Sequence, residues 1–578
     1  MITQDFKASL LEYLQQEKDF IEQDIEQHAN LSDEQKEQDG YLIRNAQVLT
    51  AWGENCYDLT ATINNTRLRP GDRVMVHNTK RKIEARVIEN GLDILSIATD
   101  TQLVVGEIYQ IEIVEAYLLD PLHTVLENCS PGTPGFGFIS QLSKQEGVVS
   151  EGPFKFSDHT IARYNTGMNT GQWDCCRMIA NNPSICCLQG PPGTGKTRTL
   201  AEAVNIVSSQ GQQVLVIALT HQAVNNALNQ IHRINSALPI IKVGDAAKAI
   251  KLDSSIKVFP SMRAYSNSLT TTKRNGDKKR MRAPQCLVIG MTFHAALVNF
   301  GIQHPRCVFP TYLFLDEASQ IPLPYASVLG TFGAGSICLF GDSKQMPPIF
   351  RPELEENELS ISILDYCAKV INTPQVALDT TYRMNKEITQ YVSSHFYEPE
   401  IVLQSSDDSA NRLFANVVPL RVEKSNIHHE HLLQDKSIIW ASYDNMLANN
   451  ATDYNAHEAK EAAEYVGAAL ELGLTIEDVA IITPYRAQVK LIRQHVIDKF
   501  TTLGLDTSHL PLIDTVERLQ GQDVELIIMS MCTTDEKYFD QNKDFLLNPN
   551  RLNVMISRAK SKVIIISSKD RYTSSTNP

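Results

Sequence analysis

Apolar residues recur every four positions along the first part of the chain, which places them on one face of a helix. The residues in this pattern are Phe6, Leu10, Leu14, Ile21 and Ile25. No proline or glycine interrupts it before Gly40. The spacing predicts a helix or a pair of helices over residues 1–40, with an apolar face that must pack on another part of the protein.

The period of the pattern changes to two between about Tyr41 and Val114, which is typical of short β-strands. Pro70-Gly71-Asp72 is a turn sequence, and Asn90-Gly91 separates apolar runs at 85–89 and 92–97. An Asn-Gly pair between two such runs predicts a hairpin with a two-residue turn. Several short strands with turns at this spacing favour a small β-barrel.

From about residue 160 onward, short apolar runs alternate with stretches of helical length, which is typical of parallel α/β sheets. The runs that we interpret as buried strands are residues 185–188, 214–219, 286–290, 311–315, 336–340, 479–482, 526–531 and 562–566. This length of chain accommodates two such sheets, and we expect them to divide near residue 360.

Length and composition restrict the class of protein. At 578 residues the chain is long enough for three or four domains, and its 43% of hydrophobic residues excludes a wholly disordered protein. No uninterrupted apolar run approaches the roughly 18 residues that cross a bilayer, and the first residues lack the order of a secretory signal. We therefore expect an intracellular, cytoplasmic protein with no membrane partner.

The net charge of −14 is concentrated near the start of the chain. Residues 1–40 hold eleven acidic residues and three lysines, a net charge of −8, so the other 538 residues carry −6. The overall acidity therefore does not exclude a local basic groove for nucleic acid. A solvated face is the simplest interpretation of the acidic N-terminal helix, and a docking surface for a protein partner is the alternative.

Candidate metal ligands are few. They are two cysteine doublets and one histidine cluster: Cys175-Cys176, Cys186-Cys187, and His428, His429 and His431. The eleven cysteines form no C-x-x-C pair and no repeating framework, so we interpret the doublets as buried small apolar residues and expect no disulfide scaffold. The histidines lie in a loop-like stretch without a second group of ligands, and we expect them to be exposed.

The first motif that indicates chemistry lies between the strand at 185–188 and a helical pattern at 199–207. It is the loop Gly190, Pro191, Pro192, Gly193, Thr194, Gly195, Lys196 and Thr197, with Arg198 directly after it. Glycines let backbone N–H groups close around a phosphate at the start of a helix, which is the geometry of an ATP-binding P-loop. In this motif Lys196 reaches the β- and γ-phosphates, and the Thr197 hydroxyl binds Mg²⁺.

A second motif delivers two carboxylates from the end of an apolar strand. Asp316 and Glu317 follow the run at 311–315, and Asp316 lies 120 residues after Lys196. The carboxyl ends of parallel strands meet at the edge where α/β sheets bind ligands. We predict that Asp316 completes the Mg²⁺ shell and that Glu317 polarises the attacking water, with a merely solvated acidic pair as the alternative.

Further motifs resemble those of the superfamily 1 helicases. They are Asp316–Gln320 (DEASQ), Gly341–Pro348 (GDSKQMPP), Thr380–Met384 (TTYRM), Val479–Gln488 (VAIITPYRAQ), Asp514–Ser530 (DTVERLQGQDVELIIMS) and Arg551–Lys560 (RLNVMISRAK). Together they are similar to the up-frameshift-like group, typified by the nonsense-mediated-decay helicase and the immunoglobulin-switch-binding helicase. The resemblance covers about Gln172 to Ser567. It implies an α/β fold of two tandem RecA-like P-loop domains with an N-terminal helical stalk and small β-barrel.

The resemblance also implies roles in ATP hydrolysis. Gln345 matches the glutamine that senses the γ-phosphate, and Arg383 and Arg558 match two arginines that stabilise charge in the transition state. Both arginines belong to the second α/β domain. The active site is therefore expected to be complete only when the two domains close, which couples hydrolysis to motion.

Recognition of the base and the sugar follows from the same resemblance. Gln172 matches an adenine-reading glutamine, with a helix-surface amide as its alternative. Tyr382 matches a tyrosine that packs on the base, and Thr380 or Thr381 stands where the family has a glutamine. Asp523 stands where the family has a glutamate that contacts the ribose.

Contacts to nucleic acid rest on residues at strand ends and on one basic run. Thr220, Thr292, Thr483 and Thr515 lie where the family places hydroxyls and backbone amides on phosphates, and a helix cap is the alternative for each. Residues 273–282 hold six basic residues and one acidic residue, among them Lys278, Lys279 and Arg280. Relatives carry an insertion here that faces the nucleic acid, with a solvated loop as the alternative.

These observations predict a domain order and a function. The expected segments are a helical stalk at 1–40, a β-barrel accessory domain at 41–115, a connector at 116–160, a first RecA-like domain at 161–360 with a basic insertion at about 245–285, and a second RecA-like domain at 361–578. We expect a monomeric ATP- and Mg²⁺-dependent translocase or helicase on single-stranded DNA or RNA, and the resemblance implies 5′→3′ movement. The alternative is a nucleic-acid-stimulated ATPase that acts as a clamp or remodeller in a partner complex without processive unwinding. A fused nuclease finds no carboxylate–lysine motif in support.

Overall fold

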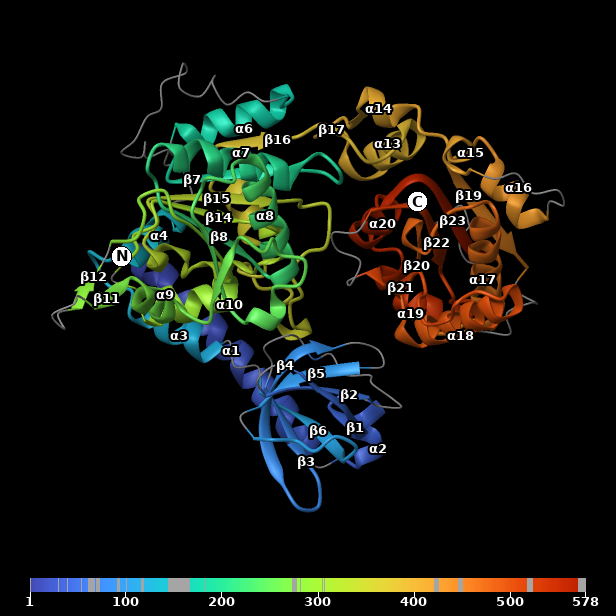
Figure 1. Ribbon diagram of the computed structural model, residues 1–578, viewed down its shortest axis with the longest axis horizontal. Helices are drawn as coiled ribbons and strands as arrows, with labels where there is room; N and C mark the ends of the chain where they lie inside the picture. Colours follow the sequence, from blue (N-terminus) through green and yellow to red (C-terminus); the bar gives the residue numbers. More distant parts are fainter. Residues whose placement is uncertain are drawn as a thin grey trace.

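The computed structural model describes residues 2–29, 31–38, 40–52, 55–60, 68, 73–90, 94–99, 101–115, 119–143, 167–181, 183–272, 278–280, 282–303, 305, 307–419, 426–444, 451–516 and 523–569. They form two α/β units that lie side by side, with a β-barrel next to them (Figure 1). Among these residues, no helix is both long and apolar enough to cross a membrane.

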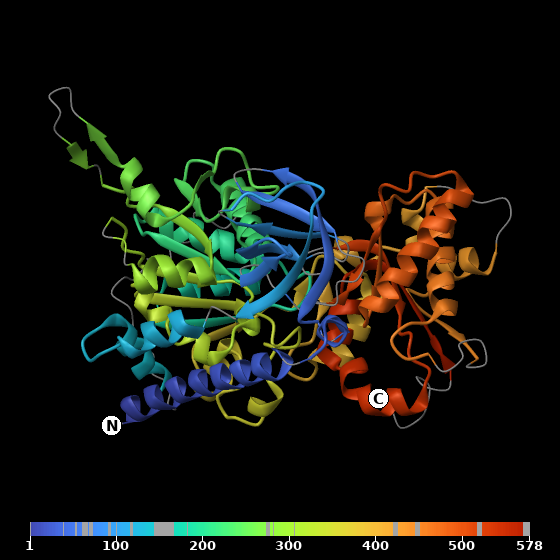
Figure 2. The ribbon, with the colours of Figure 1, turned by 90° about the horizontal axis from the view of Figure 1, so that it is seen from below.

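The N-terminal helix α1 (Ile2–Ala29) packs along the first α/β unit (Figure 2). Leu10 and Leu14 of its predicted apolar face are buried in the core of that unit. The Lys7 ammonium donates to two backbone carbonyl oxygens at 2.7 and 2.8 Å, at the end of α3 (Leu119–Glu127). A cation at the carboxyl end of a helix offsets the helix dipole.

Acidic side chains of α1 also form hydrogen bonds and ion pairs with other parts of the chain. The Tyr325 hydroxyl donates to Glu17 at 2.8 Å, and Arg351 pairs with Asp24. These contacts hold α1 against α11 (Leu323–Ala326) and against the segment that follows β15 (Ser336–Gly341) of the first unit. The helix is therefore an integral part of that unit.

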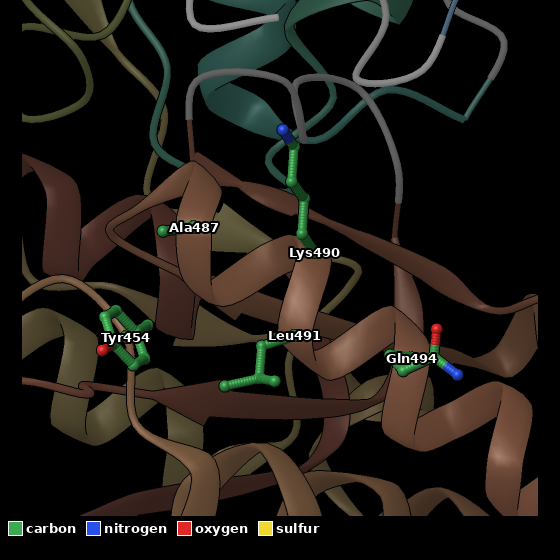
Figure 3. A pocket seen from close by; sticks show the side chains of 5 residues that line it. All are labelled: Tyr454, Ala487, Lys490, Leu491 and Gln494. Carbon is green, nitrogen blue, oxygen red and sulfur yellow. The ribbon is translucent and has the colours of Figure 1, made fainter. Parts of the chain in front are cut away.

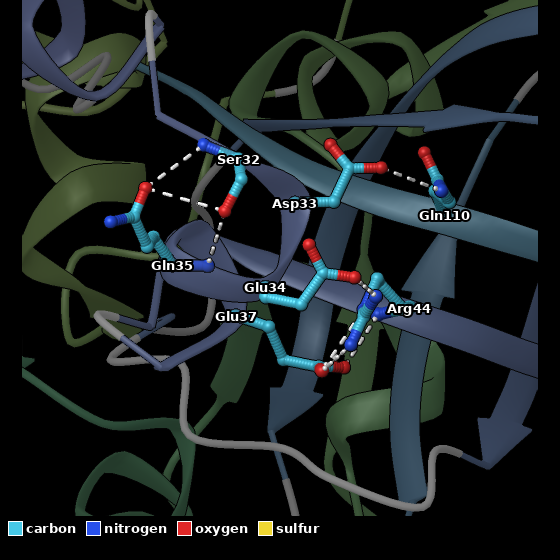
Figure 4. A network of polar contacts seen from close by, with 7 residues as sticks. All are labelled: Ser32, Asp33, Glu34, Gln35, Glu37, Arg44 and Gln110. Atoms are coloured by element: carbon cyan, nitrogen blue, oxygen red, sulfur yellow. Dashed lines mark hydrogen bonds and ion pairs between the residues drawn. The ribbon is translucent and has the colours of Figure 1, made fainter.

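A short second helix, α2 (Asp33–Gln38), is fixed to the barrel by ion pairs (Figure 4). The Arg44 guanidinium lies 2.6 Å from Glu34 and 2.8 Å from Glu37. Two of the acidic residues of the N-terminal segment are thus neutralised by a barrel arginine.

The barrel is closed by six antiparallel strands in the order β1-β2-β5-β4-β3-β6. Their bounds are β1 Leu42–Trp52, β2 Cys56–Thr60, β3 Arg73–His77, β4 Lys82–Asn90, β5 Ile94–Ala98 and β6 Ile108–Glu115. The alternation of apolar and polar residues predicted from the sequence is found in the barrel. Alternate side chains of a strand point to opposite sides, and Val74 and Val76 point to the interior and are fully buried.

The hairpin predicted at Asn90-Gly91 exists, because β4 and β5 pair with each other. Among the described residues, β4 ends at Asn90 and β5 begins at Ile94. Residues 91–93, like the turn predicted at 70–72, lie outside the described residues.

The first α/β unit is built on an eight-stranded, fully parallel sheet in the order β10-β9-β13-β8-β14-β15-β7-β16. The strands are β7 Ile185–Gln189, β8 Val214–Ala218, β9 Ile240–Val243, β10 Lys257–Phe259, β13 Val288–Thr292, β14 Tyr312–Leu315, β15 Ser336–Gly341 and β16 Gln375–Ala377. The helices that accompany them are α4 Pro134–Leu142, α6 Thr170–Ala180, α7 Lys196–Ser209, α8 His221–Ile234, α9 Met262–Ser268, α10 Phe293–Ala296, α11 Leu323–Ala326 and α12 Ile363–Asp365. Successive residues of each central strand belong to two separate apolar clusters, one on each face of the sheet.

The end of the first unit lies later than the division expected near residue 360. Strand β16 pairs with β7, and Ile363 and Leu364 are buried in the core of the first unit. The first sheet therefore takes chain up to about residue 378. A three-residue strand that pairs with a partner far away in sequence has no local signal of its own.

The second α/β unit has a five-stranded parallel sheet in the order β19-β23-β22-β20-β21. The strands are β19 Ile438–Tyr443, β20 Val479–Thr483, β21 Leu512–Thr515, β22 Val524–Ser530 and β23 Ala559–Ser568. The helices are α13 Lys386–Val392, α14 Asp407–Ala410, α15 Phe414–Val417, α16 Ile427–Leu433, α17 Ala456–Glu471, α18 Arg486–Leu503, α19 Glu536–Leu546 and α20 Pro549–Ile556. Two parallel sheets with a helical stalk and a barrel confirm the predicted fold class.

The histidine cluster was expected to be an exposed loop, and this expectation is wrong. The histidines form α16, which Asn426 caps, and His429 is almost fully buried. His428 lies 3.0 Å from Glu461 of α17. The contact with α17 is long-range, so the local sequence does not reveal it. The cysteine doublets are buried in apolar clusters, as expected.

Candidate functional site

The glycine-rich loop joins β7 to α7 at the carboxyl edge of the first sheet. Gly193 and Gly195 have φ values of 73° and 85°, which favour glycine. A Cβ on Gly193 would lie 2.5 Å from both Arg383 Cβ and Thr381 Oγ1. The loop therefore needs glycine there for a second reason, because the chain of the second unit approaches it this closely.

Backbone hydrogen bonds fix this approach. The Tyr382 N–H donates to the Gly193 carbonyl at 2.8 Å, and the Thr381 hydroxyl donates to the Pro192 carbonyl at 2.9 Å. The segment that carries Arg383 is thus attached to the P-loop itself.

Lys196, at the first position of α7, folds back over the loop. Its ammonium donates to the Gly190 carbonyl oxygen at 2.6 Å. Its charge also acts on two buried carboxylates, Asp316 and Asp342, and opposes the rise in pKa that burial produces in both. The Lys196 ammonium therefore lies close to the loop and to both carboxylates, at a place where a bound phosphate would also contact it.

Strand β14 delivers Asp316 and Glu317 to the same edge. Burial raises the pKa of Asp316 to about 7, and the charge of Glu317 adds to the rise. Glu317 has a φ of 56°, a left-handed conformation that is uncommon for a residue with a side chain and often marks a functional site. Its carboxylate accepts a hydrogen bond from the Gln320 amide at 3.3 Å.

The predicted phosphate sensor Gln345 belongs to a buried network around Asp342. One oxygen of Asp342 accepts from the Gln189 amide at 2.6 Å. Its other oxygen, Oδ2, accepts from the Gln345 amide and from the Tyr397 hydroxyl, each at 2.6 Å. Tyr397 is a core residue of the second unit. Asp342 Oδ2 therefore accepts one hydrogen bond from each unit.

Helix α20 of the second unit completes this contact between the units. The Asn553 amide donates to the Tyr397 hydroxyl at 2.8 Å and to the Lys344 carbonyl at 2.7 Å. The Asn550 amide donates to the Gln345 carbonyl at 2.5 Å. The backbone of the sensor loop is thereby held by the second unit.

The two predicted arginines lie together near the P-loop. The Arg383 guanidinium pairs with Asp523 at 2.5 Å and donates to the Ser557 carbonyl at 2.9 Å. Burial, together with the charge of Arg383, lowers the pKa of Arg558 to about 10. The Nε atoms of both arginines are buried and find no hydrogen-bond partner among the described residues. Buried, unpaired cationic donors are costly and indicate a site for an anion.

The residues predicted to recognise the base and the sugar make other contacts in the structure. The Gln172 side chain accepts from the Asn169 N–H at 3.2 Å and donates to the Thr194 carbonyl at 3.0 Å, so it ties the start of α6 to the P-loop. It is buried, unlike the helix-surface amide considered as its alternative. Tyr382 is half-exposed, and its hydroxyl accepts from the Asn169 side chain at 3.0 Å. Asp523 pairs with Arg383, as described above.

The four threonines lie at the carboxyl ends of parallel strands, as predicted. Thr220 and Thr292 cap α8 and α10, so the helix-cap alternative describes their hydroxyls. Thr483 ends β20 and is fully buried, and Thr515 ends β21.

The described part of the basic run, residues 278–280, forms one strand of a small two-stranded sheet. Lys278, Lys279 and Arg280 make up β12 (Lys278–Arg280), which pairs with β11 (Thr270–Thr272) in a two-stranded sheet. This small sheet projects from the first unit (Figure 2, green, upper left).

Among the residues of the site that escaped the sequence analysis are Gln189, Tyr397 and Asn553. Gln189 directly precedes the P-loop, and Asn553 lies inside the last helicase-like motif, so each has a neighbour that could have drawn attention to it. Tyr397 has no such signal.

Comparison with known proteins agrees with this geometry. Two family models, each described as an AAA domain, match residues 172–351 and 359–570. The DNA replication ATP-dependent helicase/nuclease DNA2 of Saccharomyces cerevisiae is 27% identical over 451 residues, which are 72% of this chain and 26% of that protein. The DNA polymerase alpha-associated DNA helicase A of Schizosaccharomyces pombe is 25% identical, over 77% of this chain and 70% of that protein. The Regulator of nonsense transcripts 1 homolog of Drosophila melanogaster is 26% identical, over 66% of this chain and 32% of that protein.

The chain spans about a quarter of the length of the DNA2 relative. Among solved structures, the helicase nonstructural protein 10 of an Arterivirus aligns with 91% of this chain and 77% of that one, at 10% identity and a TM-score of 0.39. The P-loop, the paired carboxylates and these matches together support the resemblance of the chain to the superfamily 1 helicases of the up-frameshift-like group.

Proposed function

We propose that this protein is an ATP-hydrolysing translocase and helicase that moves 5′→3′ along single-stranded nucleic acid. The observation that carries the proposal is the approach of two arginines of the second unit to the P-loop of the first. Because hydrolysis would need groups from both units, each turnover would change how the units grip a bound strand.

The P-loop supplies the phosphate site of this proposal. Backbone N–H groups at the start of α7 point toward a bound phosphate, and Lys196 would exchange the Gly190 carbonyl for the β- and γ-phosphates. Gln345 would leave Asp342 to contact the γ-phosphate. Glu317, at the open edge of β14, would orient the attacking water and accept its proton.

The residues that would hold Mg²⁺ are Thr197 and Asp316. They fit this ion, because the buried Asp316 carboxylate lies beside Glu317 and a cation would relieve both the burial and the repulsion that raise its pKa. When bound, Mg²⁺ would supply positive charge that offsets the negative charge developing on the phosphate during transfer. Asp316 would position the ion beside the P-loop, and Glu317 would remain available as the base.

Arg383 and Arg558 would stabilise the charge of the transferring phosphoryl group. Such arginines contribute on the order of 10³–10⁵ in rate. In the structure Arg383 pairs with Asp523, so phosphate binding would require an exchange of one anion for another. Tyr382 would pack on the base at the rim of the loop, where its ring is half-exposed. For Gln172 and Asp523, we propose that contacts to adenine and ribose form only after their present partners are released.

Nucleic acid would lie across the carboxyl edges of both sheets. Thr220 and Thr292 of the first unit and Thr483 and Thr515 of the second mark that edge, where helix starts and backbone amides can bind phosphates. The basic strand at 278–280 would extend the track on the first unit.

We propose the following organisation: a stalk at 1–40, a barrel at 41–115, a connector at 116–160, a first RecA-like domain from 161 to about 378 and a second one after it. The protein would act as a monomer, with the acidic face of α1 as the surface for a protein partner. None of the eleven cysteines is in a disulfide, which supports a reducing compartment such as the cytoplasm.

The test is steady-state ATP hydrolysis with poly-dT, with poly-U and with no polymer, beside the variant Glu317→Gln. We expect stimulation by at least one polymer, and loss of hydrolysis in the variant while nucleotide still binds. Displacement of a strand from a duplex with a 5′ tail, and not from one with a 3′ tail, would establish the direction. Stimulated hydrolysis without strand displacement from either duplex would instead favour a clamp or remodeller.

A further inference from the structure

Near the starts of α17 and α18, the second unit has a hollow of about 420 Å³ whose lining includes no residue of the ATP site. Its lining residues are Tyr454, Ala487, Lys490, Leu491 and Gln494 (Figure 3). We propose that this hollow is a stacking subsite for a base of single-stranded nucleic acid, with the ring of Tyr454 as the platform and Lys490 as the partner of an adjacent phosphate. The inference rests on the proposed function, since it adds a contact to the nucleic-acid track.

The hollow lies at the ligand-binding edge of the second sheet. Strands β19 to β23 run parallel, so their carboxyl ends share one edge. Tyr454 immediately precedes the cap of α17, which follows β19, and the other four residues belong to the first turns of α18, which follows β20 and Thr483. The two helices pack against each other, which brings their starts together at this edge.

The backbone around Tyr454 is held on both sides. On one side, the Ala451 N–H donates to the Thr534 hydroxyl at 2.8 Å, and the Thr533 hydroxyl donates to the Thr452 carbonyl at 2.7 Å. These bonds anchor the segment to the chain that leaves β22.

On the other side, the next residue forms a reciprocal pair with a glutamine of α18. The Asn455 N–H donates to the Gln488 side chain at 2.7 Å, and the Gln488 amide donates back to the Asn455 carbonyl at 3.1 Å. Both residues are buried. The backbone that carries Tyr454 is therefore held on both sides, and Asn455 and Gln488 of this network are not reached by solvent.

The ring of Tyr454 is nevertheless 58% exposed. A large aromatic group whose backbone is held and whose ring is open to solvent loses little entropy when a ligand covers it, so it suits a stacking contact. Leu491 lies beside it and adds an apolar wall, while Lys490 extends away from both (Figure 3). The Lys490 ammonium forms no ion pair with the described residues, so its charge is available to a phosphate.

This combination favours nucleic acid over an apolar ligand. A base offers a flat face to the tyrosine ring, and the phosphate joined to it offers the negative charge that the lysine lacks. Stacking does not read sequence, which matches a protein that must move along any strand.

The test measures the affinity of the full chain for fluorescently labelled oligo-dT and oligo-U by anisotropy at several salt concentrations. We expect Tyr454→Ala to weaken binding by about fivefold to 150-fold, the cost of one lost base–aromatic stack. Tyr454→Phe keeps the ring and should bind like the wild type. Lys490→Ala should reduce the slope of log affinity against log salt by about one.

Matched controls are available on the far side of the molecule. Phe309 is 72% exposed and precedes the amino end of β14, so Phe309→Ala should leave affinity unchanged. Lys436 precedes the amino end of β19, so Lys436→Ala is the control for Lys490→Ala and should leave the slope of log affinity against log salt unchanged. Thermal unfolding of each variant establishes that it folds.

The outcomes separate the two hypotheses. If the wild type binds and Tyr454→Ala folds and binds equally well, the subsite does not exist, whatever the protein does. If Tyr454→Phe binds as weakly as Tyr454→Ala, the ring does not act by stacking and the proposal is also wrong. If the wild type binds neither oligonucleotide, the proposed function itself fails. A loss confined to oligo-dT or to oligo-U would support the subsite and assign its natural strand.

Discussion

Removing the hydroxyl of Tyr397 should weaken the binding of ATP and leave the binding of ADP unchanged. In the structure, Asp342 Oδ2 accepts two hydrogen bonds, one from the Gln345 amide and one from the Tyr397 hydroxyl. If Gln345 turns to a γ-phosphate, Tyr397 becomes the remaining side-chain donor to that oxygen. ADP has no γ-phosphate, so it does not draw Gln345 away.

The size of the effect follows from the burial of the carboxylate. Asp342 has no exposed surface, so in Tyr397→Phe the departure of Gln345 would leave a buried, charged oxygen without its donors. Leaving such a group unsatisfied costs about 1–3 kcal/mol, which corresponds to about fivefold to 150-fold in affinity. The wild type avoids this cost, because the bond to Tyr397 is already in place.

The assay compares the dissociation constants of ATP and ADP by calorimetry in a Glu317→Gln background, which prevents hydrolysis. Tyr391→Phe is the matched control, since it removes a hydroxyl from the neighbouring helix without touching Asp342. A third variant, Gln345→Ala, removes the sensor, so adding Tyr397→Phe to it should no longer change the ratio of the two constants.

Equal weakening of ATP and ADP in Tyr397→Phe would refute this reasoning, because it would mean that the hydroxyl merely stabilises the fold. An additive effect in the double variant would refute it as well, since the two donors would then act independently.

Three further predictions follow from other parts of the structure. Arg558→Ala should lower kcat for ATP by about 10³–10⁵ with little change in KM, measured in steady state, because the arginine would act on the transition state; a change confined to KM would contradict that role. Burial raises the pKa of Glu458 to about 7 from an unfolded value near 4.5, so its contribution to stability is present below about pH 4.5 and lost as the pH rises to 7, a change of about 3 kcal/mol. Urea unfolding of the wild type and Glu458→Gln across this range should show the wild type losing about 3 kcal/mol relative to the variant as the pH rises, because glutamine keeps the neutral form, and a constant difference would count against the shift. Leu14→Ala should cost about 2–5 kcal/mol of stability in thermal unfolding, since the side chain fills the core between α1 and the first unit; no loss would mean that the stalk is not docked in solution.

The fold was predictable where its signal is local. The apolar runs at 214–219 and 479–482 are long enough to be strands in any context, and both are found as β8 and β20. The short strand β16 was not predictable, because its place in the first sheet depends on pairing with β7. The α16 histidines were misjudged for the same reason, since their burial depends on α17.

In the candidate site, too, residues with a local sequence signal were predictable and residues brought together only by folding were not. The P-loop and the carboxylates of β14 are contiguous motifs with a fixed chemical purpose, so the sequence places them directly. The donors around Asp342 come from three separate segments, and only folding brings Gln189 and Tyr397 to one carboxylate. A motif names the residues that touch the ligand, whereas the residues that position them are scattered along the chain.

Two of the contacts between the units explain why hydrolysis and movement would be inseparable in this chain. One contact joins Tyr382 to the P-loop at Gly193, next to Arg383, the arginine proposed to act in catalysis. The other joins Tyr397 to Asp342, next to Gln345, the proposed phosphate sensor. A γ-phosphate would act on both, because it would compete with Asp523 for Arg383 and with Asp342 for Gln345. A ligand that changes both contacts shifts the equilibrium between two arrangements of the units, and loss of the ligand reverses the shift.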